Sequence, residues 1–281
     1  MRVFAIRDDE IAGKDLGYLL YYEGSKAFYI ELPEEADEWE TPMILSSFVR
    51  RGEHSVNAYW SMVWVRQRIV PQDRQNLGQI LKDNGLDAYD ELQLLLLGHG
   101  RCAQDNVYIT EVEDIPVSMK ARWQYKIEDA VPLADQCLLV FFRDGSARRI
   151  SIKTMTQDKP EFAPVLSHER IFNNVMIQPD GYGVAWSESC TIADHELYNS
   201  GETVPLTLND MQRFVSHRIV NAAEAQEMLH CSRQNIADLV KRGKLHPIRT
   251  DGNNRLFMKT EIQQRMDNVS YKATGRLFCQ E

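Results

Sequence analysis

The sequence has few cysteines, and their arrangement predicts neither a disulfide framework nor a zinc site. The five cysteines, Cys102, Cys137, Cys190, Cys231 and Cys279, are scattered, odd in number and never form a C-x-x-C pair. This usage is typical of reduced thiols in a cytoplasm. We therefore expect no disulfide, no metal and no cofactor.

Long apolar runs are also missing. The longest, Leu92 to Leu97, is interrupted by Gln93 and is far shorter than the roughly 20 residues of a membrane-spanning helix. The opening residues, MRVFAIRDDE, contain no long apolar stretch and no small-residue cleavage site, so secretion is not expected. These absences favour a cytoplasmic protein without a membrane partner.

No enzyme signature stands out. His99 and Cys102 lie in a His-Gly-Arg-Cys turn, where a cysteine nucleophile beside a histidine base is conceivable. However, the sequence has no second ligand pair at zinc spacing and no glycine-rich phosphate loop. We predict no catalytic residue, and an enzyme that uses His99 and Cys102 remains an alternative.

Charge is distributed unevenly along the chain. The net charge is −9, yet residues 211–281 contain 12 Lys and Arg against 7 Asp and Glu, a balance of +5. The remaining residues contain 20 against 34, a balance of −14. A basic segment beside an acidic body is expected where one module binds a polyanion and the rest binds something else.

The N-terminal part shows both strand and helix patterns. A strand is expected at Val3–Ile6, and a hairpin is expected from two aromatic segments, Tyr18–Tyr22 and Lys26–Leu32. The spacing of Val56, Tyr59, Trp60, Val63 and Trp64 predicts a helix, whose aromatic stripe is either core or a partner-binding face.

The tripeptide Arg-Gln-Asn occurs twice, each time at an expected helix start. At Arg74-Gln75-Asn76, Asp73 is the expected N-cap of a helix that runs to about Asn84, and Gly85 is suited to end it. At Arg233-Gln234-Asn235, Ser232 is the expected N-cap. We interpret the first copy as an ordinary exposed helix start, or at most part of a protein contact, because it lies in the acidic body and lacks both an upstream helix with a tight break and a basic wing after it.

Two short helices separated by a tight break are expected between Val220 and Gly243. Asn221 can cap the first, with Glu224 three residues later as in a capping box. Ser232 can cap the second, which Gly243 ends. The apolar positions that would bring the helices together are Ala222, Ala225, Met228, Leu229, Ile236, Leu239 and Val240. This pattern predicts a helix-turn-helix.

A small β-hairpin, or wing, is expected next. Its strands would be Leu245–Thr250 and Arg255–Met258, joined by Asp251-Gly252-Asn253-Asn254, and Thr260 would cap a last helix.

This segment resembles the MerR/excisionase-like winged helix-turn-helix family. The resemblance rests on Ala223-Glu224-Ala225, Leu229, Ser232-Arg233-Gln234-Asn235-Ile236, Arg242-Gly243-Lys244-Leu245-His246-Pro247-Ile248-Arg249, Asn254-Arg255-Leu256 and Lys259-Thr260-Glu261-Ile262. It covers about a sixth of the chain and implies DNA binding, with the second helix in the major groove.

The residue types are suited to that role. Arg233 can pair bidentately with guanine, and Gln234 or Asn235 with adenine. The free N–H groups near Ser232 favour a phosphate. The candidate DNA-binding residues are Ser232, Arg233, Gln234, Asn235, Lys241, Arg242, Lys244, Arg249, Asn253, Asn254 and Arg255. The alternative is a small helical domain in which these side chains are merely solvated.

Two further resemblances concern the rest of the chain. Residues 138–201 resemble a small bacterial α+β family of unknown function, through Leu139-Val140-Phe141-Phe142, Arg143-Asp144-Gly145, Arg148-Arg149-Ile150, Phe162-Ala163-Pro164-Val165-Leu166, Phe172, Val184-Ala185-Trp186, Ile192 and Leu197-Tyr198. The Leu16–Leu32 hairpin and the acidic loop after it are similar to the small N-terminal subdomain of HipA-type toxin kinases. That likeness implies a partner-binding module, as in an antitoxin.

Together these patterns predict a multidomain α+β protein. We expect a mixed partner-binding or sensing domain at 1–115, a small α+β domain at 133–202 and a winged helix-turn-helix at 209–281. Pro116–Pro132 and Gly201–Pro205 are expected to be boundary and linker segments. The predicted function is a DNA-binding transcriptional regulator, with an antitoxin-like autorepressor as one specific form and a homodimer as one assembly. A protein–protein adaptor without DNA binding is the alternative.

Overall fold

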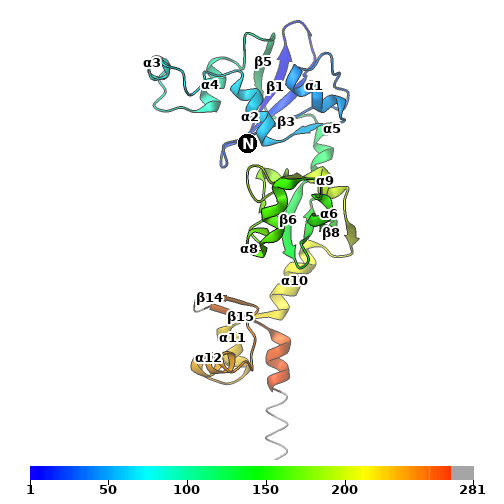
Figure 1. Ribbon diagram of the computed structural model, residues 1–281, viewed down its shortest axis with the longest axis vertical. Coiled ribbons are helices and arrows are strands. Elements are labelled where there is room, and N and C mark those ends of the chain that lie inside the picture. Colours follow the sequence, from blue (N-terminus) through cyan, green and yellow to red (C-terminus); the bar gives the residue numbers. More distant parts are fainter. Residues whose placement is uncertain (253, 267–281) are drawn as a thin grey trace, which may run out of the picture. The chain divides into compact units, whose positions relative to one another are not determined.

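The computed structural model describes residues 1–252 and 254–266. The chain is a mixed α+β protein, and its described strands form antiparallel sheets. It divides into two compact units, residues 1–204 and residues 205–281 (Figure 1). The predicted regions 1–115 and 133–202 both lie in the first unit, each around its own sheet, and 209–281 lies in the second.

The N-terminal half of the first unit is built on a five-stranded sheet in the order β4-β3-β2-β1-β5. Its strands are β1 (Arg2–Asp8), β2 (Gly17–Tyr22), β3 (Ala27–Glu31), β4 (Ser55–Val56) and β5 (Val107–Val112). Its helices are α1 (Met43–Arg50), α2 (Ala58–Arg66), α3 (Leu77–Asp83), α4 (Glu91–Leu97), α5 (Val117–Lys120) and the 3₁₀ turn η1 (Ala121–Tyr125). The predicted strand at Val3–Ile6 and the hairpin after it are confirmed.

Both faces of this sheet are buried. Because successive side chains on a strand point to opposite faces, Phe4 and Ile6 pack with Trp64 in one core. Val3 and Ala5 pack in a second core, which includes Tyr182 from the middle of the chain. The sheet is therefore the layer that joins the two halves of the unit.

The middle of the chain forms two smaller sheets. One has the order β12-β8-β7-β6 and the other β11-β10-β9. The strands are β6 (Ile127–Leu133), β7 (Cys137–Phe142), β8 (Ala147–Ser151), β9 (Met176–Ile177), β10 (Gly183–Ala185), β11 (Thr191–Ala193) and β12 (Glu202–Val204). The helical turns are α6 (Ile152–Met155), η2 (Pro160–Phe162), α7 (Ala163–Ser167), α8 (Glu169–Phe172), η3 (Pro179–Gly181) and α9 (Asp194–Tyr198).

The structure places regular elements inside both segments that were predicted as boundary or linker, although the division between the two units does fall in the second, between Val204 and Pro205. Pro116–Pro132 contains α5, η1 and most of β6, and Gly201–Pro205 contains β12, which pairs with β8. Both segments contain strands whose partners lie outside the segment, so the turn-like composition of each one concealed its pairing. A strand pairing of this kind cannot be predicted from local composition alone.

A buried polar cluster joins the two halves of the first unit. Glu31, which is fully buried, accepts hydrogen bonds from Tyr182 Oη at 2.6 Å, Ser55 Oγ at 2.9 Å and Arg122 Nη2 at 3.1 Å. Beside it, Lys126 Nζ donates to Asp180 Oδ2 at 2.8 Å. Because buried charges are costly unless paired, these contacts hold the halves in one arrangement.

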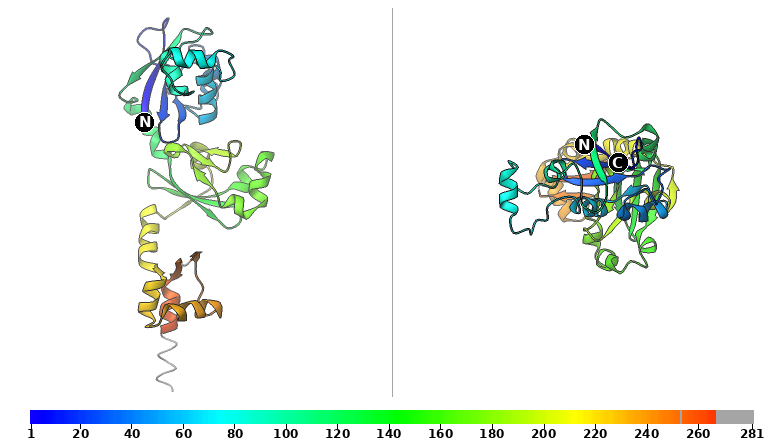
Figure 2. Two further views of the ribbon diagram at one scale, coloured as in Figure 1. Left: turned by 90° about the vertical axis from the view of Figure 1, so that its left-hand side faces the viewer. Right: turned by 90° about the horizontal axis from the view of Figure 1, so that it is seen from above.

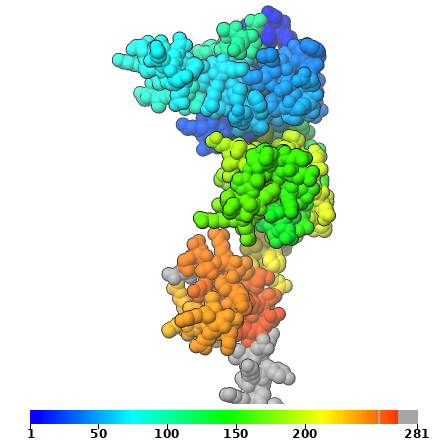
Figure 3. All heavy atoms as spheres, in the orientation of Figure 1, coloured from blue at the N-terminus to red at the C-terminus, as the bar shows by residue number. Residues whose placement is uncertain are grey.

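The helix after the first Arg-Gln-Asn copy begins later than predicted. α3 starts at Leu77, its N-cap position is Asn76, and neither Asn76 nor Asp73 caps it through a side-chain hydrogen bond. Gly85, with φ of +69°, ends it as predicted. α3 buries no residue and protrudes from the sheet (Figure 2; Figure 3). Arg74 and Gln75 therefore lie in the turns before a helix and not on it.

The aromatic stripe of α2 is only partly core. Trp64 is fully buried, whereas Tyr59 is 66% exposed and Trp60 is 42% exposed. Tyr59 also lines a largely apolar groove of about 620 Å³ with Met62 and Met176. The core interpretation therefore holds for Trp64, whereas Tyr59 and Trp60 lie at the surface.

The second unit combines helices with a three-stranded sheet in the order β13-β15-β14. Its elements are α10 (Leu208–Arg218), β13 (Ile219–Asn221), α11 (Ala222–Met228), α12 (Arg233–Lys241), β14 (Arg249–Asp251) and β15 (Asn254–Met258), followed by helical residues 259–266. The core is Val220, Ala225, Ile236, Leu239, Leu245, Phe257 and Ile262. Thr260 lies inside the last helix, which begins at Lys259, so its predicted capping role is wrong.

Two kinds of feature are absent from the part of the chain that the structure describes. Within residues 1–252 and 254–266, no helix is long and apolar enough to span a membrane. The same residues contain no cluster of three or more His, Cys, Asp or Glu side chains that could bind a metal ion.

Candidate nucleic-acid interface

The first helix of the candidate interface starts with a complete capping box. Asn221 Oδ1 accepts from the backbone N–H of Ala223 at 2.8 Å and of Glu224 at 3.0 Å, and Glu224 Oε2 accepts from Asn221 N at 2.7 Å. These bonds satisfy N–H groups that α11 would otherwise leave free. The predicted cap at Asn221 is confirmed.

The break between α11 and α12 is tight. His230 has φ of +48°, an uncommon conformation for a residue with a side chain, and Cys231 N donates to Gln226 O at 3.0 Å. Ser232 Oγ then accepts from Asn235 N at 3.3 Å and caps α12. The helices pack through Ile236 against the fully buried Ala225. Two short helices separated by a tight break are therefore present as predicted, and the Ser232 cap is confirmed.

The first turn of α12 presents polar side chains to solvent. Arg233, Gln234 and Asn235 are all exposed. In the described residues, none of their side chains has a hydrogen-bond or ion-pair partner. The polar groups of these side chains are therefore exposed and are not used in hydrogen bonds or ion pairs among the described residues.

A hairpin of β14 and β15 lies next to these two helices. Thr250 pairs with Arg255, and Gly252, with φ of +54°, makes the turn. β13 adds a third strand, in which Val220 pairs with Phe257. The predicted hairpin is present, but its first strand starts at Arg249 and not at Leu245, and Asp251 and Asn254 pair in the strands and not in the turn; the third strand was not predicted. Asn253 lies outside the described residues.

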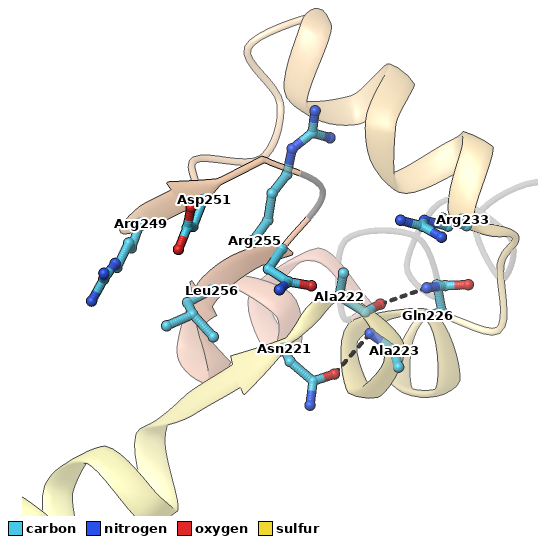
Figure 4. A pocket seen from close by; sticks show the side chains of 10 residues that line it. Asn221, Ala222, Ala223, Gln226, Arg233, Arg249, Asp251, Arg255 and Leu256 are labelled. Atoms are coloured by element: carbon cyan, nitrogen blue, oxygen red, sulfur yellow. Dashed lines mark hydrogen bonds between the residues drawn. The ribbon is translucent and has the colours of Figure 1, made fainter.

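A hollow of about 550 Å³ separates the wing from the two helices (Figure 4). Its lining residues are Asn221, Ala222, Ala223, Gln226, Arg233, Arg249, Asp251, Asn254, Arg255 and Leu256. In the view of Figure 4, Arg255 extends from the hairpin toward the side on which α12 lies, whereas Arg249 points to the other side. Three arginines from separate elements thus surround one concave surface.

Only some of the candidate DNA-binding residues line the hollow. Arg233, Arg249, Asn254 and Arg255 line it. Ser232, Gln234 and Asn235 lie at the same end of α12 but do not line it, and Lys241, Arg242 and Lys244 are found at the other end of that helix. The cations at the C-terminal end of α12 are favourably placed for the helix dipole.

Three polar residues of the hollow were missed by the sequence-based prediction. Asn221 was expected only as a cap, Gln226 was assigned no role, and Asp251 was taken as part of a turn. Asp251 opposes the binding of a phosphate, because its carboxylate is also negative. The hairpin register that brings Asp251 and Arg249 to the hollow depends on β15, which local patterns do not reveal.

Two ionisable groups near the interface have shifted pKa values. Hydrogen bonds from the side chain and backbone of Thr207 lower the pKa of Asp210 at the start of α10. Burial raises the pKa of the Cys231 thiol in the break between α11 and α12. Cys231 therefore behaves as a small packed side chain and not as a reactive thiolate.

The cations that the structure describes in this unit are free of ion pairs. The described residues 205–266 contain ten Lys and Arg, and none of them forms a salt bridge within that stretch or with the rest of the described chain. His246, which lies 2.9 Å from Glu261 Oε1 through its Nδ1, is the paired basic group here. The described cations of this unit are thus not engaged in ion pairs, although carboxylates such as Asp251 lie near some of them.

Comparison with known proteins adds no relative: no family model, no curated protein and no solved structure matches the chain. The candidate interface therefore rests on its own geometry.

Proposed function

We propose that the chain is a sequence-specific, DNA-binding transcriptional regulator. The observation that carries the proposal is the exposed, unpartnered Arg233-Gln234-Asn235 turn beside a hollow lined by wing arginines. The start of α12 supplies groups that pair with base edges, and Arg249 and Arg255 supply charges for the phosphate backbone. Lys241, Arg242 and Lys244 add phosphate contacts at the other end of the helix.

The first unit supports the second half of the proposal, a protein partner. Tyr59 is 66% exposed and lines the apolar groove with Met62 and Met176. Exposed aromatic and methionine side chains are enriched at protein interfaces. An antitoxin-like autorepressor, which holds a toxin through residues 1–115 and represses its own operon from a cytoplasmic location, is the specific form that we favour.

An adaptor without DNA binding is the second candidate. The same groove in the first unit favours it, because a protein partner could bind there whether or not the second unit binds DNA. The two candidates differ in whether the free cations of the second unit bind a polyanion.

Binding of the full-length chain to duplexes selected from a random pool, measured across a salt series, tests the proposal. The logarithm of the affinity should fall linearly with the logarithm of salt concentration, with a slope of roughly −0.9 per phosphate contact. Arg233→Ala should cost about 1–3 kcal/mol on the selected site and relax the preference at one base pair.

The chain contains a matched control for this variant. Arg74→Ala changes the same tripeptide in the turns before α3 and should leave DNA affinity unchanged. Equal losses in both variants, or binding that does not respond to salt, would contradict the proposal and favour the adaptor.

A further inference from the structure

Helix α10 carries apolar side chains that none of the described hydrophobic cores uses. It spans Leu208–Arg218 and contains no buried residue. Phe214 is 47% exposed and Val215 is 51% exposed. An apolar stripe of this kind on a solvated helix is a surface for another molecule.

The marginal stability of α10 also indicates that another molecule covers its apolar stripe. A helix of 11 residues is marginal in water without tertiary packing. α10 has a complete capping box between Thr207 and Asp210, but a cap contributes only about 0.5–2 kcal/mol. The helix therefore gains from any partner that covers its apolar stripe.

The arrangement of charges on α10 indicates that its partner is a second copy of the same helix. Asp210, Phe214 and Arg218 are four residues apart, so they lie along one face with opposite charges at the two ends. Thr207 donates to Oδ2 of Asp210, and Oδ1 accepts no hydrogen bond from the described residues. Arg218 has no ion pair within the same part of the chain. This face is complementary to itself in the antiparallel direction.

We propose that α10 pairs antiparallel with α10 of a second copy of the chain, around a two-fold axis at Phe214. Each Asp210 then faces Arg218 of the other copy, the two Phe214 rings meet, and the helix dipoles oppose each other favourably. Such a contact is isologous, because both copies use the same patch. The pairing is measured without DNA, so it does not rest on the proposed function.

The area that the two helices can bury is small. A pair of 11-residue helices buries less than the roughly 1,200 Å² of a standard interface, so the dimer is weak. Binding of both copies to neighbouring half-sites would strengthen the dimer on DNA, because the second contact becomes intramolecular.

Thiol cross-linking of the full-length chain tests the geometry. Phe214→Cys places a thiol on the axis, and a short bifunctional thiol reagent should then convert the protein to a covalent dimer. Gln212→Cys, which is exposed about 200° around the same helix, is the matched control and should stay monomeric. The unmodified chain shows the background from its native thiols.

Sedimentation equilibrium tests the energetics. Phe214→Ser should raise the dimer dissociation constant at least about tenfold, because it removes the central apolar contact. Arg218→Glu should do the same, whereas Arg218→Lys should keep the dimer. These positions are exposed, so the variants should fold, as circular dichroism can verify.

Three results would overturn the pairing. The first is a chain that stays monomeric at every concentration reached. The second is an unreactive introduced thiol in the monomeric Phe214→Cys variant, which would mean that the same chain covers α10. The third is a dimer that Phe214→Ser leaves intact. DNA binding measured in the salt series can succeed or fail independently of each.

Discussion

Residues 1–204 and residues 205–266 use their basic side chains in opposite ways. In the first unit, 11 of the 20 Lys and Arg form ion pairs with carboxylates. Some of these are buried, such as Lys126 with Asp180. In the described part of the second unit, none of the ten is paired. The first unit thus uses about half of its cations in its own fold, whereas the described part of the second leaves its cations unpaired.

The two units also differ in what holds them together. The first adds non-local polar contacts, such as those of Glu31, to the large apolar cores on both sides of its seam. The second relies on local caps, at Thr207, Asn221 and Ser232, and on a small apolar core. A change of charge should therefore alter stability in the first unit and binding in the second.

The largest effect on stability is expected from Glu31→Gln. This change leaves Arg122, whose side chain is 18% exposed, without its counter-charge. The free energy of unfolding of the first unit should fall by about 3–5 kcal/mol. All five tryptophans lie in residues 1–204, so denaturant titration followed by tryptophan fluorescence reports this unit alone.

Glu111→Gln is the control for that prediction. Glu111 pairs with Arg2 at the surface and is 53% exposed, so its loss should cost less than about 1 kcal/mol. Similar losses in the two variants would show that the buried cluster does not hold the halves together.

A smaller effect on the stability of the first unit is expected from a change of pH, through the protonation of His195. The carboxylate of Asp194, whose Oδ1 lies 3.6 Å from His195 Nδ1, raises the pKa of His195 together with the charges of Glu196 and Glu53, although burial opposes the rise. A raised pKa in the folded state means that protonation stabilises the unit. This stabilisation is fully present below the unfolded pKa of about 6.5 and is lost as pH rises through the folded pKa.

The magnitude should stay below about 1 kcal/mol, because the side chain is 50% exposed. The free energy of unfolding of the wild type and of His195→Gln, each measured at about pH 5.5 and pH 8, gives this contribution. An unchanged difference between the two pH values in the variant would assign the dependence to other groups.

The smallest effect on stability is expected from Arg249→Gln. Because Arg249 is exposed and unpaired among the described residues, the free energy of unfolding of the second unit should change by less than about 0.5 kcal/mol. The salt slope of DNA binding should fall by about 0.9. Arg101→Gln, which breaks a surface pair with Asp9, should leave that slope unchanged. A clear loss of stability with Arg249→Gln would contradict the contrast between the units.

Local chemistry explains which parts of the fold were predictable. The caps at Asn221 and Ser232 and the turn at Gly252 depend on residues within three positions, and the structure confirms them. Asp73 had the right residue type for a cap, but its helix starts at Leu77. A favourable type thus indicates a possible cap without fixing the start of the helix.

Non-local pairing explains what was missed. β12 and β13 hydrogen-bond to strands that are separated from them by other elements, and β6 pairs with β7 through an irregular register. The hollow shares this property, because Asn221, Arg233 and Arg255 meet only after β13 pairs with β15. The chemistry of single candidate residues could be predicted, but their grouping could not.

The bond between Tyr182 and Glu31 has a consequence for the time course of synthesis. The two residues are 151 positions apart. At about 5–20 residues per second, a ribosome needs roughly 8–30 s to make the chain between them. During that interval the nascent N-terminal sheet contains a carboxylate whose phenol donor does not yet exist. The sheet reaches its final hydrogen bonding only when the middle of the chain emerges, so residues 1–204 mature together.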